Sequence, residues 1–252
     1  DIIVGIDVSN SMLAEDLQPN RLERAKRSVE QFIEKLANDR IGIVVFAGQA
    51  YNQLPITTDY AAAKLFLSTI STGTVPVQGT AIGRAIELGM KSFNFEDSRN
   101  KVMVIITDGE NHEDDAAKAA AEAAGKGVFV YTVGMGSPAG APIPVNSRGQ
   151  KNYRMDNQGN TVVSRLNEEM LKEIASAGNG MYVRANNAGG ALRKVHEEIN
   201  KLEKTEFESK RFTDYEDRFQ PFIALCLLLL IIEFIINERK SVWVEKLNLF
   251  NE

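Results

Sequence analysis

The chain has little of the chemistry that several common protein classes need. It contains one cysteine, Cys226, which excludes an internal disulfide and a cysteine-ligated metal cluster. Lys and Arg number 29 against 34 Asp and Glu, the formal net charge is −5, and no basic patch dominates, so no nucleic acid partner is expected. The sequence also lacks a glycine-rich phosphate loop, a dinucleotide fingerprint and internal repeats, which argues against nucleotide binding and repeat architectures.

The length and composition of the chain indicate a globular domain with an appendage. The 252 residues are 44% hydrophobic and 25% charged, and the mean hydropathy of −0.20 does not suggest a polytopic membrane protein. The chain begins at Asp1, directly at the edge of an apolar run and without an initiator Met. We therefore expect a fragment whose upstream signal or anchor is missing.

Apolar, β-branched runs alternate with helical patterns along most of the chain. Such runs are typical of strands buried on both faces of a parallel sheet, and the alternation predicts right-handed crossovers and a Rossmann-like α/β fold. The predicted strands are 2–6, 41–46, 50–56 (an edge strand), 102–106, 128–133 and 181–183. The predicted helices are 22–36, 59–67, 80–90, 116–124, 167–177 and 188–204. Asn20 and Asp59 are expected to cap two of them.

The segment from Gly134 to Arg165 interrupts this alternation. It is rich in Gly, Pro and Asn and contains only short β-like pieces, with a plausible hairpin turn at 157–160. We interpret it as a β excursion at the surface, between two core elements of the domain.

Two polar stretches follow predicted core strands directly. Asp7-Val8-Ser9-Asn10-Ser11 follows the first strand, and Thr107-Asp108-Gly109 follows the fourth. In an open α/β sheet the ligand site lies beyond the carboxyl ends of the strands, near the topological switch point. Thr80, at the start of a predicted helix, is expected to join them. Carboxylates and hydroxyls are the ligands of a hard divalent cation, so the sequence predicts a Mg²⁺ or Mn²⁺ site. The predicted metal ligands are Asp7, Ser9, Ser11, Thr80 and Asp108.

Each of these residues also has a simpler interpretation. The three hydroxyls alone would suit helix caps or turns, and Asp108 before Gly109 would suit a turn. The combination of all five at strand ends favours the metal site. The acidic run 110–115 is interpreted as a helix start that complements the helix dipole, with His112 as a solvated loop residue.

The C-terminal part is predicted to carry a membrane span. Residues 219–236 form an 18-residue apolar run with one charge, Glu233, and a span needs about 17–25 residues. We therefore expect a domain over 1–204, a charged juxtamembrane linker over 205–218, a transmembrane helix over 219–237 and a short tail over 238–252. The alternative is a buried core helix.

The site pattern resembles a known family. Asp7-x-Ser9-x-Ser11, Thr80 and Asp108-Gly109 are similar to the metal-ion-dependent adhesion site of von Willebrand factor type A (VWA) domains. The resemblance covers about residues 1–204 and implies that the serines and the threonine ligate the metal, while Asp108 often acts through water. It also implies that a carboxylate from a partner protein completes the coordination shell.

Further motifs narrow the resemblance to the bacterial Bat membrane proteins of the aerotolerance operon. These motifs are Asp7-to-Met12, Pro19-Asn20-Arg21-Leu22 and the run 213–219 before the predicted span. The resemblance implies upstream transmembrane segments, an association with other Bat proteins and with MoxR-type AAA+ ATPases, and a domain on the periplasmic side of the inner membrane. Charge counting points weakly the other way, because residues 201–218 just before the predicted span contain five Lys and Arg, and three follow the span.

Three functions remain open at this level. We expect a non-enzymatic, membrane-anchored module that uses Mg²⁺ or Mn²⁺ to capture an acidic residue of a protein partner. The alternative is a Mg²⁺-dependent phosphoryl-transfer enzyme with Asp7 as nucleophile. Such enzymes often place a second Asp two residues later, where this chain has Ser9. The third is a structural scaffold whose site has lost its metal.

Overall fold

The computed structural model describes residues 1–110, 114–147, 150–185, 190–201 and 220–235. Contacts divide the chain into two units, residues 1–203 and residues 204–252, which are described separately. Part of the last predicted helix and all of the predicted linker and tail lie outside the described residues.

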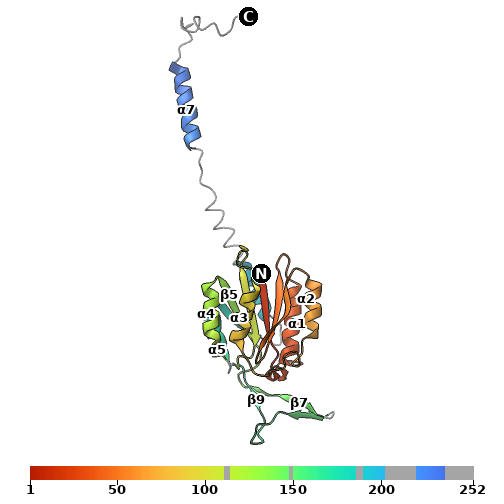
Figure 1. Ribbon diagram of the computed structural model, residues 1–252. Helices are drawn as coiled ribbons and strands as arrows, with labels where there is room; N and C mark the ends of the chain where they lie inside the picture. The colour runs from red at the N-terminus through yellow and green to blue at the C-terminus, as the bar shows by residue number, and fades with distance from the viewer. Residues whose placement is uncertain (111–113, 148–149, 186–189, 202–219, 236–252) are drawn as a thin grey trace. The chain divides into compact units, whose positions relative to one another are not determined.

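A six-stranded sheet in the order β10-β5-β4-β1-β2-β3 forms the centre of the first unit (Figure 1). Every neighbouring pair is parallel except β2 and β3, so β3 is an antiparallel edge strand. This confirms the predicted mostly parallel α/β sheet. The strands are β1 (Ile2–Asp7), β2 (Ile41–Phe46), β3 (Ala50–Thr57), β4 (Lys101–Thr107), β5 (Val128–Gly134) and β10 (Asn179–Arg184).

Helices cover both faces of the sheet and create two cores. The α-helices of this unit with labels are α1 (Arg21–Ile33), α2 (Tyr60–Thr69), α3 (Ile82–Ser92), α4 (Ala116–Gly125) and α5 (Glu168–Ala177). A further helix runs over residues 191–201. Alternate residues of β1 point to opposite faces: Ile2, Val4 and Ile6 join the core under α1, α2 and the helix over 191–201. Ile3 joins the core under α3, α4 and α5 (Figure 1).

The register of the sheet brings the ends of β1 and β4 together. Ile6 pairs with Ile106, so Asp7 and Thr107 occupy the same level at the carboxyl edge. From β1 the chain runs to β2 and β3 on one side and later to β4, β5 and β10 on the other. The gap between β1 and β4 is therefore the topological switch point, where open α/β sheets place their ligands.

The predicted β excursion is present and projects from the same edge (Figure 1). It contains β6 (Ala141–Pro142) paired with β9 (Val163–Ser164), and β7 (Pro144–Ser147) paired with β8 (Gln150–Tyr153), both antiparallel. Both of its ends are held by the backbone after β4. Met135 N donates to the Thr107 carbonyl at 2.8 Å, and Asn167 N donates to the Asp108 carbonyl at 2.9 Å.

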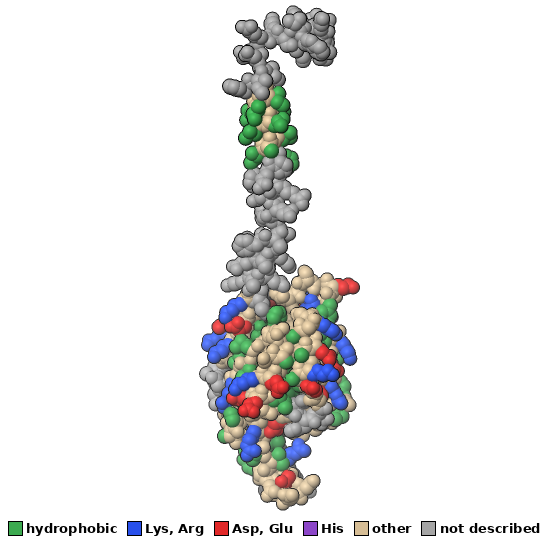
Figure 2. All heavy atoms as spheres, turned by 90° about the vertical axis from the view of Figure 1, so that its left-hand side faces the viewer, with side chains coloured by type: hydrophobic (Ala, Val, Ile, Leu, Met, Phe, Trp, Pro, Cys, Tyr) green, Lys and Arg blue, Asp and Glu red, His purple; other side chains and the backbone are tan. Residues whose placement is uncertain are grey.

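The helix predicted to span a membrane is described over only part of its predicted length. In the second unit the structure describes α7 (Gln220–Ile235), a 16-residue helix. Figure 2 shows hydrophobic side chains along the face of this helix turned to the viewer, and the apolar residues from Phe222 to Ile232 are exposed. None of the helices in the described residues is both long and apolar enough to cross a bilayer. The predicted transmembrane helix over 219–237 is thus not supported, and its ends at 219 and 236–237 lie outside the described residues.

Candidate functional site

Asp7 ends β1, and the turn after it gathers two serine hydroxyls. Asp7 is fully buried, and its Oδ1 accepts a hydrogen bond from Ser9 N at 2.8 Å. The Ser9 and Ser11 hydroxyls are hydrogen-bonded to each other at 2.9 Å. Ser9 precedes the short 3₁₀ helix η1 (Asn10–Leu13), but its side chain makes no capping hydrogen bond. Its hydroxyl is thus not used as a helix cap and remains available as a ligand beside Ser11.

Asp108 lies beside Asp7 because β1 and β4 are neighbours. The Thr107 hydroxyl connects the two strand ends: it donates to Asp7 Oδ2 at 2.5 Å and accepts from Gly109 N at 3.1 Å. Asp108 is fully buried, and its Oδ1 accepts from Glu110 N at 3.2 Å. Gly109 has a φ of +75°, a left-handed conformation that glycine adopts at low cost. The glycine therefore lets the chain turn sharply away directly after the carboxylate.

Thr80 is brought to the same edge of the sheet by the loop before α3. It is buried, and the next residue, Ala81, donates its N–H to the Ala47 carbonyl just beyond β2 at 2.8 Å. Asn10 N donates to Gln78 Oε1 at 3.0 Å, which joins this loop to the loop that carries the serines. The structure thus places the five predicted residues at the end of β1 and on the loops next to it. Metal binding by these five stays a prediction.

The N-terminus of α3 is capped from the acidic run rather than by Thr80. The Asp114 carboxylate accepts from Gly83 N at 2.9 Å and from Arg84 N at 2.8 Å. Asp115 caps α4 by accepting from Lys118 N at 3.0 Å. The predicted role of this run at a helix start therefore holds for Asp115, whereas Asp114 serves a different helix. His112 lies outside the described residues.

The surroundings of Asp7 destabilise its ionised form. Burial and, after it, the negative charge of Asp108 together raise the pKa of Asp7 to about 7, against the hydrogen bonds from Thr107 and Ser9. A divalent cation between these groups would stabilise both ionised forms. Two carboxylates and three hydroxyls are hard oxygen donors, and they suit Mg²⁺ or Mn²⁺ better than a softer metal. Among the described residues no three His, Cys, Asp or Glu side chains form a metal cluster, so the hydroxyls are essential to this donor set.

The buried side chain of Arg21 forms an ion pair with Asp108. Arg21, the first residue of α1, is fully buried, and its Nη1 donates to Asp108 Oδ2 at 2.9 Å and to Ser164 Oγ at 2.6 Å. Its Nε and Nη2 each donate to one carboxylate oxygen of Asp16 at 2.8 Å. Burial alone would raise the pKa of Asp16, but Arg21 outweighs it and holds that pKa below its usual value. Arg21 therefore joins α1, β9 and the site carboxylate.

Three residues that shape the site were not among the predicted ligands: Thr107, Arg21 and Ser164. Thr107 was visible in the sequence as a hydroxyl residue next to Asp108. Arg21 was visible only as part of the Pro19-to-Leu22 motif. Ser164 lies in the irregular excursion, 143 residues from Arg21, and no local pattern indicates its role. Nearby, Glu110 Oε1 accepts from Arg165 N at 2.8 Å, and burial raises the Glu110 pKa.

Comparisons with known proteins agree with this fold. Residues 2–110 match the von Willebrand factor type A domain family. A crystal structure of BatB from Bacteroides thetaiotaomicron is 50% identical, with a TM-score of 0.77, and the match covers 81% of this chain and 98% of that one. An aerotolerance-related membrane protein from Bacteroides fragilis is 48% identical, with a TM-score of 0.76 and coverage of 79% and 98%. In both of these structures a unit of this extent is folded on its own.

More distant relatives extend the comparison. An uncharacterized protein from Borreliella burgdorferi is 29% identical over 94% of this chain and 69% of its own length. The chain spans about three-fifths of the length of a further relative from Mycolicibacterium paratuberculosis, at 26% identity and 59% coverage. At the level of the fold alone, a mussel byssus matrix protein with a zinc-occupied MIDAS motif is 19% identical with a TM-score of 0.55, over 80% of this chain and 45% of that one.

Proposed function

Because the chain belongs to the von Willebrand factor type A domain proteins, as a relative of BatB, we propose that it is a non-enzymatic binding module. It holds a divalent cation, Mg²⁺ or Mn²⁺, with Asp7, Ser9, Ser11, Thr80 and Asp108. A carboxylate from a protein partner completes the coordination shell. Domains of this family are usually adhesion or interaction modules, which supports the absence of a catalytic role.

The observation that carries this proposal is the pair of buried carboxylates at the switch point of the sheet. Asp7 and Asp108 are both fully buried, and only Asp108 pairs with a described cationic side chain, that of Arg21. A second positive charge is therefore missing from the described environment of Asp7. The protein contributes only two charges and three hydroxyls, so a bound ion would remain electrophilic and would attract an anionic oxygen from outside.

Titration of Mg²⁺ and Mn²⁺ into residues 1–203 tests the metal site. We expect saturable binding in isothermal titration calorimetry, and a loss of at least about tenfold in affinity for Asp7→Asn and for Asp108→Asn. Glu30→Gln is the matched control, because Glu30 is an exposed carboxylate on α1. Binding that is equal in all four proteins would refute the assignment of the ligands.

The phosphoryl-transfer alternative has no observation in its favour. Both Asp7 carboxylate oxygens already accept hydrogen bonds, from Ser9 N and from the Thr107 hydroxyl, which restricts Asp7 as a nucleophile. A phosphatase assay on the Mg²⁺-loaded protein tests it directly. Turnover that disappears in Asp7→Asn would replace the binding proposal with the enzymatic one.

We also propose that the segment 219–237 attaches the protein to the bacterial inner membrane, with the domain on the periplasmic side. The exposed apolar side chains of α7 and the membrane proteins among the relatives support attachment. Other Bat proteins and a MoxR-type AAA+ ATPase are the proposed partners, by family resemblance alone. Cells that express the protein with or without residues 219–252 are fractionated to test membrane attachment. Protease treatment of spheroplasts then tests on which side of the membrane the domain lies.

A further inference from the structure

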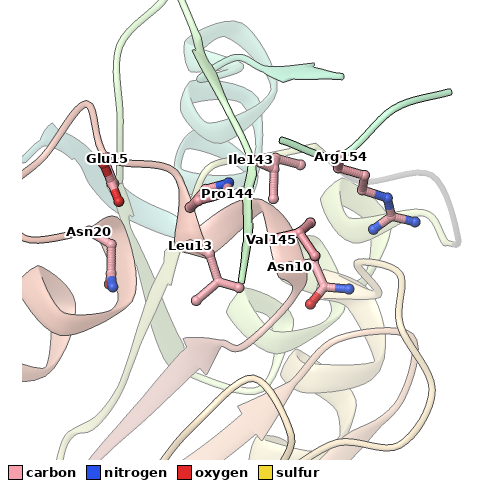
Figure 3. Close-up of a pocket in the computed structure, with 8 residues that line it drawn as sticks. All are labelled: Asn10, Leu13, Glu15, Asn20, Ile143, Pro144, Val145 and Arg154. Carbon is pink, nitrogen blue, oxygen red and sulfur yellow. The ribbon is translucent and has the colours of Figure 1, made fainter. Parts of the chain in front are cut away.

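A preformed groove lies directly beside the candidate metal site. It has a volume of about 560 Å³, within the range of cavities that bind ligands. One wall comes from η1 and the segment between it and α1, and the other from the β excursion (Figure 3). Its lining residues are Asn10, Leu13, Glu15, Asn20, Ile143, Pro144, Val145 and Arg154. Asn10 stands between Ser9 and Ser11 in the sequence, so the groove is continuous with the loop that carries two of the proposed ligands.

Both walls of the groove are held in place by hydrogen bonds. In η1, Ala14 N donates to the Ser11 carbonyl at 3.0 Å, and Met12 and Ala14 are buried beneath it. In the excursion, Arg154 N donates to the Ile143 carbonyl at 2.9 Å. The Asp16 carboxylate accepts from Ser137 N at 2.7 Å and so ties the excursion to the η1 side. A groove with fixed walls can bind without a large ordering cost.

The chemistry of the groove is apolar in the middle and charged at its sides. Leu13, Ile143 and Val145 supply the apolar surface, and the Val145 side chain is 43% exposed although it is a large aliphatic group. Figure 3 shows Arg154 beside Ile143 and Val145, with Glu15 on the opposite side. Among the described residues no carboxylate pairs with Arg154, so its guanidinium is able to donate hydrogen bonds to a carboxylate from outside.

We propose that this groove binds the stretch of the partner protein next to the carboxylate that completes the metal shell. This proposal rests on the proposed function. The partner segment is extended and acidic: one carboxylate reaches the metal, a large aliphatic side chain enters between Leu13 and Val145, and a second carboxylate pairs with Arg154. Continuity with the metal loop and the charge of Arg154 both favour such a segment. The groove would therefore select among acidic partners that the metal alone could not distinguish.

Model peptides test the proposal on residues 1–203 with Mg²⁺. The probes are nonapeptides of Gly and Ser that carry one Asp and one Leu, separated by zero to three residues in either order, with or without a second Asp. Matched peptides replace Leu by Ala or the first Asp by Asn. Binding is followed by NMR of the methyl groups of Leu13, Ile143 and Val145. We expect at least one Leu peptide to bind about 10- to 100-fold more tightly than its Ala counterpart, the ratio given by burial of a leucine side chain.

Two variants locate the effect. Val145→Ser should reduce the preference for Leu over Ala, and Arg154→Gln should remove the preference for the second Asp. Leu65→Ser is the control, because Leu65 is 65% exposed on α2, in a different part of the domain. Val145 is itself partly exposed, so its replacement should leave folding intact.

The outcomes separate the two proposals. Equal affinity for Leu and Ala peptides, with affinity still dependent on Mg²⁺ and the first Asp, would overturn the groove and leave the metal site. A Leu preference that survives EDTA would overturn the metal-dependent capture and leave the groove as a binding surface. Failure of every peptide to shift the three methyl signals at millimolar concentration would overturn the groove.

Discussion

Arg21→Met should destabilise the domain strongly. The substitution keeps a long side chain but removes the guanidinium, which is fully buried and makes charged hydrogen bonds to Asp16 and Asp108. After the substitution, Asp108 lacks a cationic partner among the described residues. Removing one partner of a buried ion pair costs about 3–5 kcal/mol, because the other charge is left buried and uncompensated. For a domain of this size, that loss corresponds to a fall in Tm of about 6–20 °C.

Urea denaturation and calorimetry of residues 1–203 without metal measure this loss. Arg99→Met is the matched control, because Arg99 is 54% exposed and lies 3.7 Å from Asp97, where an ion pair contributes at most about 1 kcal/mol. Arg21→Met leaves the carboxylates of Asp16 and Asp108 without their cationic partner, and adding Asp16→Ala removes one of these two charges. The double variant should therefore lose less stability than the sum of the single variants.

The loss of stability caused by Arg21→Met should also depend on pH, in the direction set by the pKa of Asp16. The folded-state pKa of Asp16 lies below its unfolded value because of Arg21, so its contribution is present above the unfolded pKa and is lost as pH falls through the folded one. The difference between wild type and Arg21→Met should consequently narrow below about pH 4. A loss no larger than that of Arg99→Met at pH 7, or one that does not change with pH, would refute the argument.

Three further predictions concern the site and its support. The apparent Mg²⁺ affinity should rise with pH until Asp7, with its pKa of about 7 in the metal-free protein, is ionised; calorimetry that finds a constant affinity from pH 5.5 to 8.5 would contradict this. Thr107→Val should lower Mg²⁺ affinity by about 10- to 100-fold and Thr107→Ser should restore it, because the hydroxyl orients Asp7; equal affinities in a titration would exclude that role. Gly136→Ala should lower the Tm, since its φ is +120° and the new Cβ would lie 2.6 Å from Arg21 Nε. Gly125→Ala, with nothing within 4 Å, should not.

The sheet was predictable because its signals are local. Continuous β-branched runs such as 102–106 indicate strands buried on both faces, and both capping predictions, at Asn20 and Asp59, are confirmed. The positions of Asp7 and Asp108 followed from one further rule, that parallel strands present their carboxyl ends at one edge. The sequence pattern and a general property of sheets were together sufficient to place these two residues.

The support of the site was not predictable, because it depends on contacts between distant residues. Arg21 reaches Asp108 across 87 residues, and the helical periodicity around it indicates only an amphipathic α1. The groove likewise arises where the excursion packs beside η1, which no local pattern predicts. The predicted C-terminal span is not supported by the described part of α7, and the ends predicted for it lie outside the described residues.

The way in which the excursion is attached should allow it to be replaced by the corresponding segment of a relative. Met135 at its start and Asn167 just after its end donate their N–H groups to the carbonyls of Thr107 and Asp108, two consecutive residues. Because these two attachment points are adjacent, the chain leaves and re-enters the sheet region at one place, whatever the length or sequence of the segment between them. A replacement would have to preserve the side chain of Ser164, which accepts a hydrogen bond from Arg21, and the backbone contact of Ser137 with Asp16. A chimaera that receives this segment from a relative should keep the ion chemistry of its own domain and acquire the partner preference of the donor. In evolution, the same arrangement would allow recognition to diversify without renewed selection of the fold.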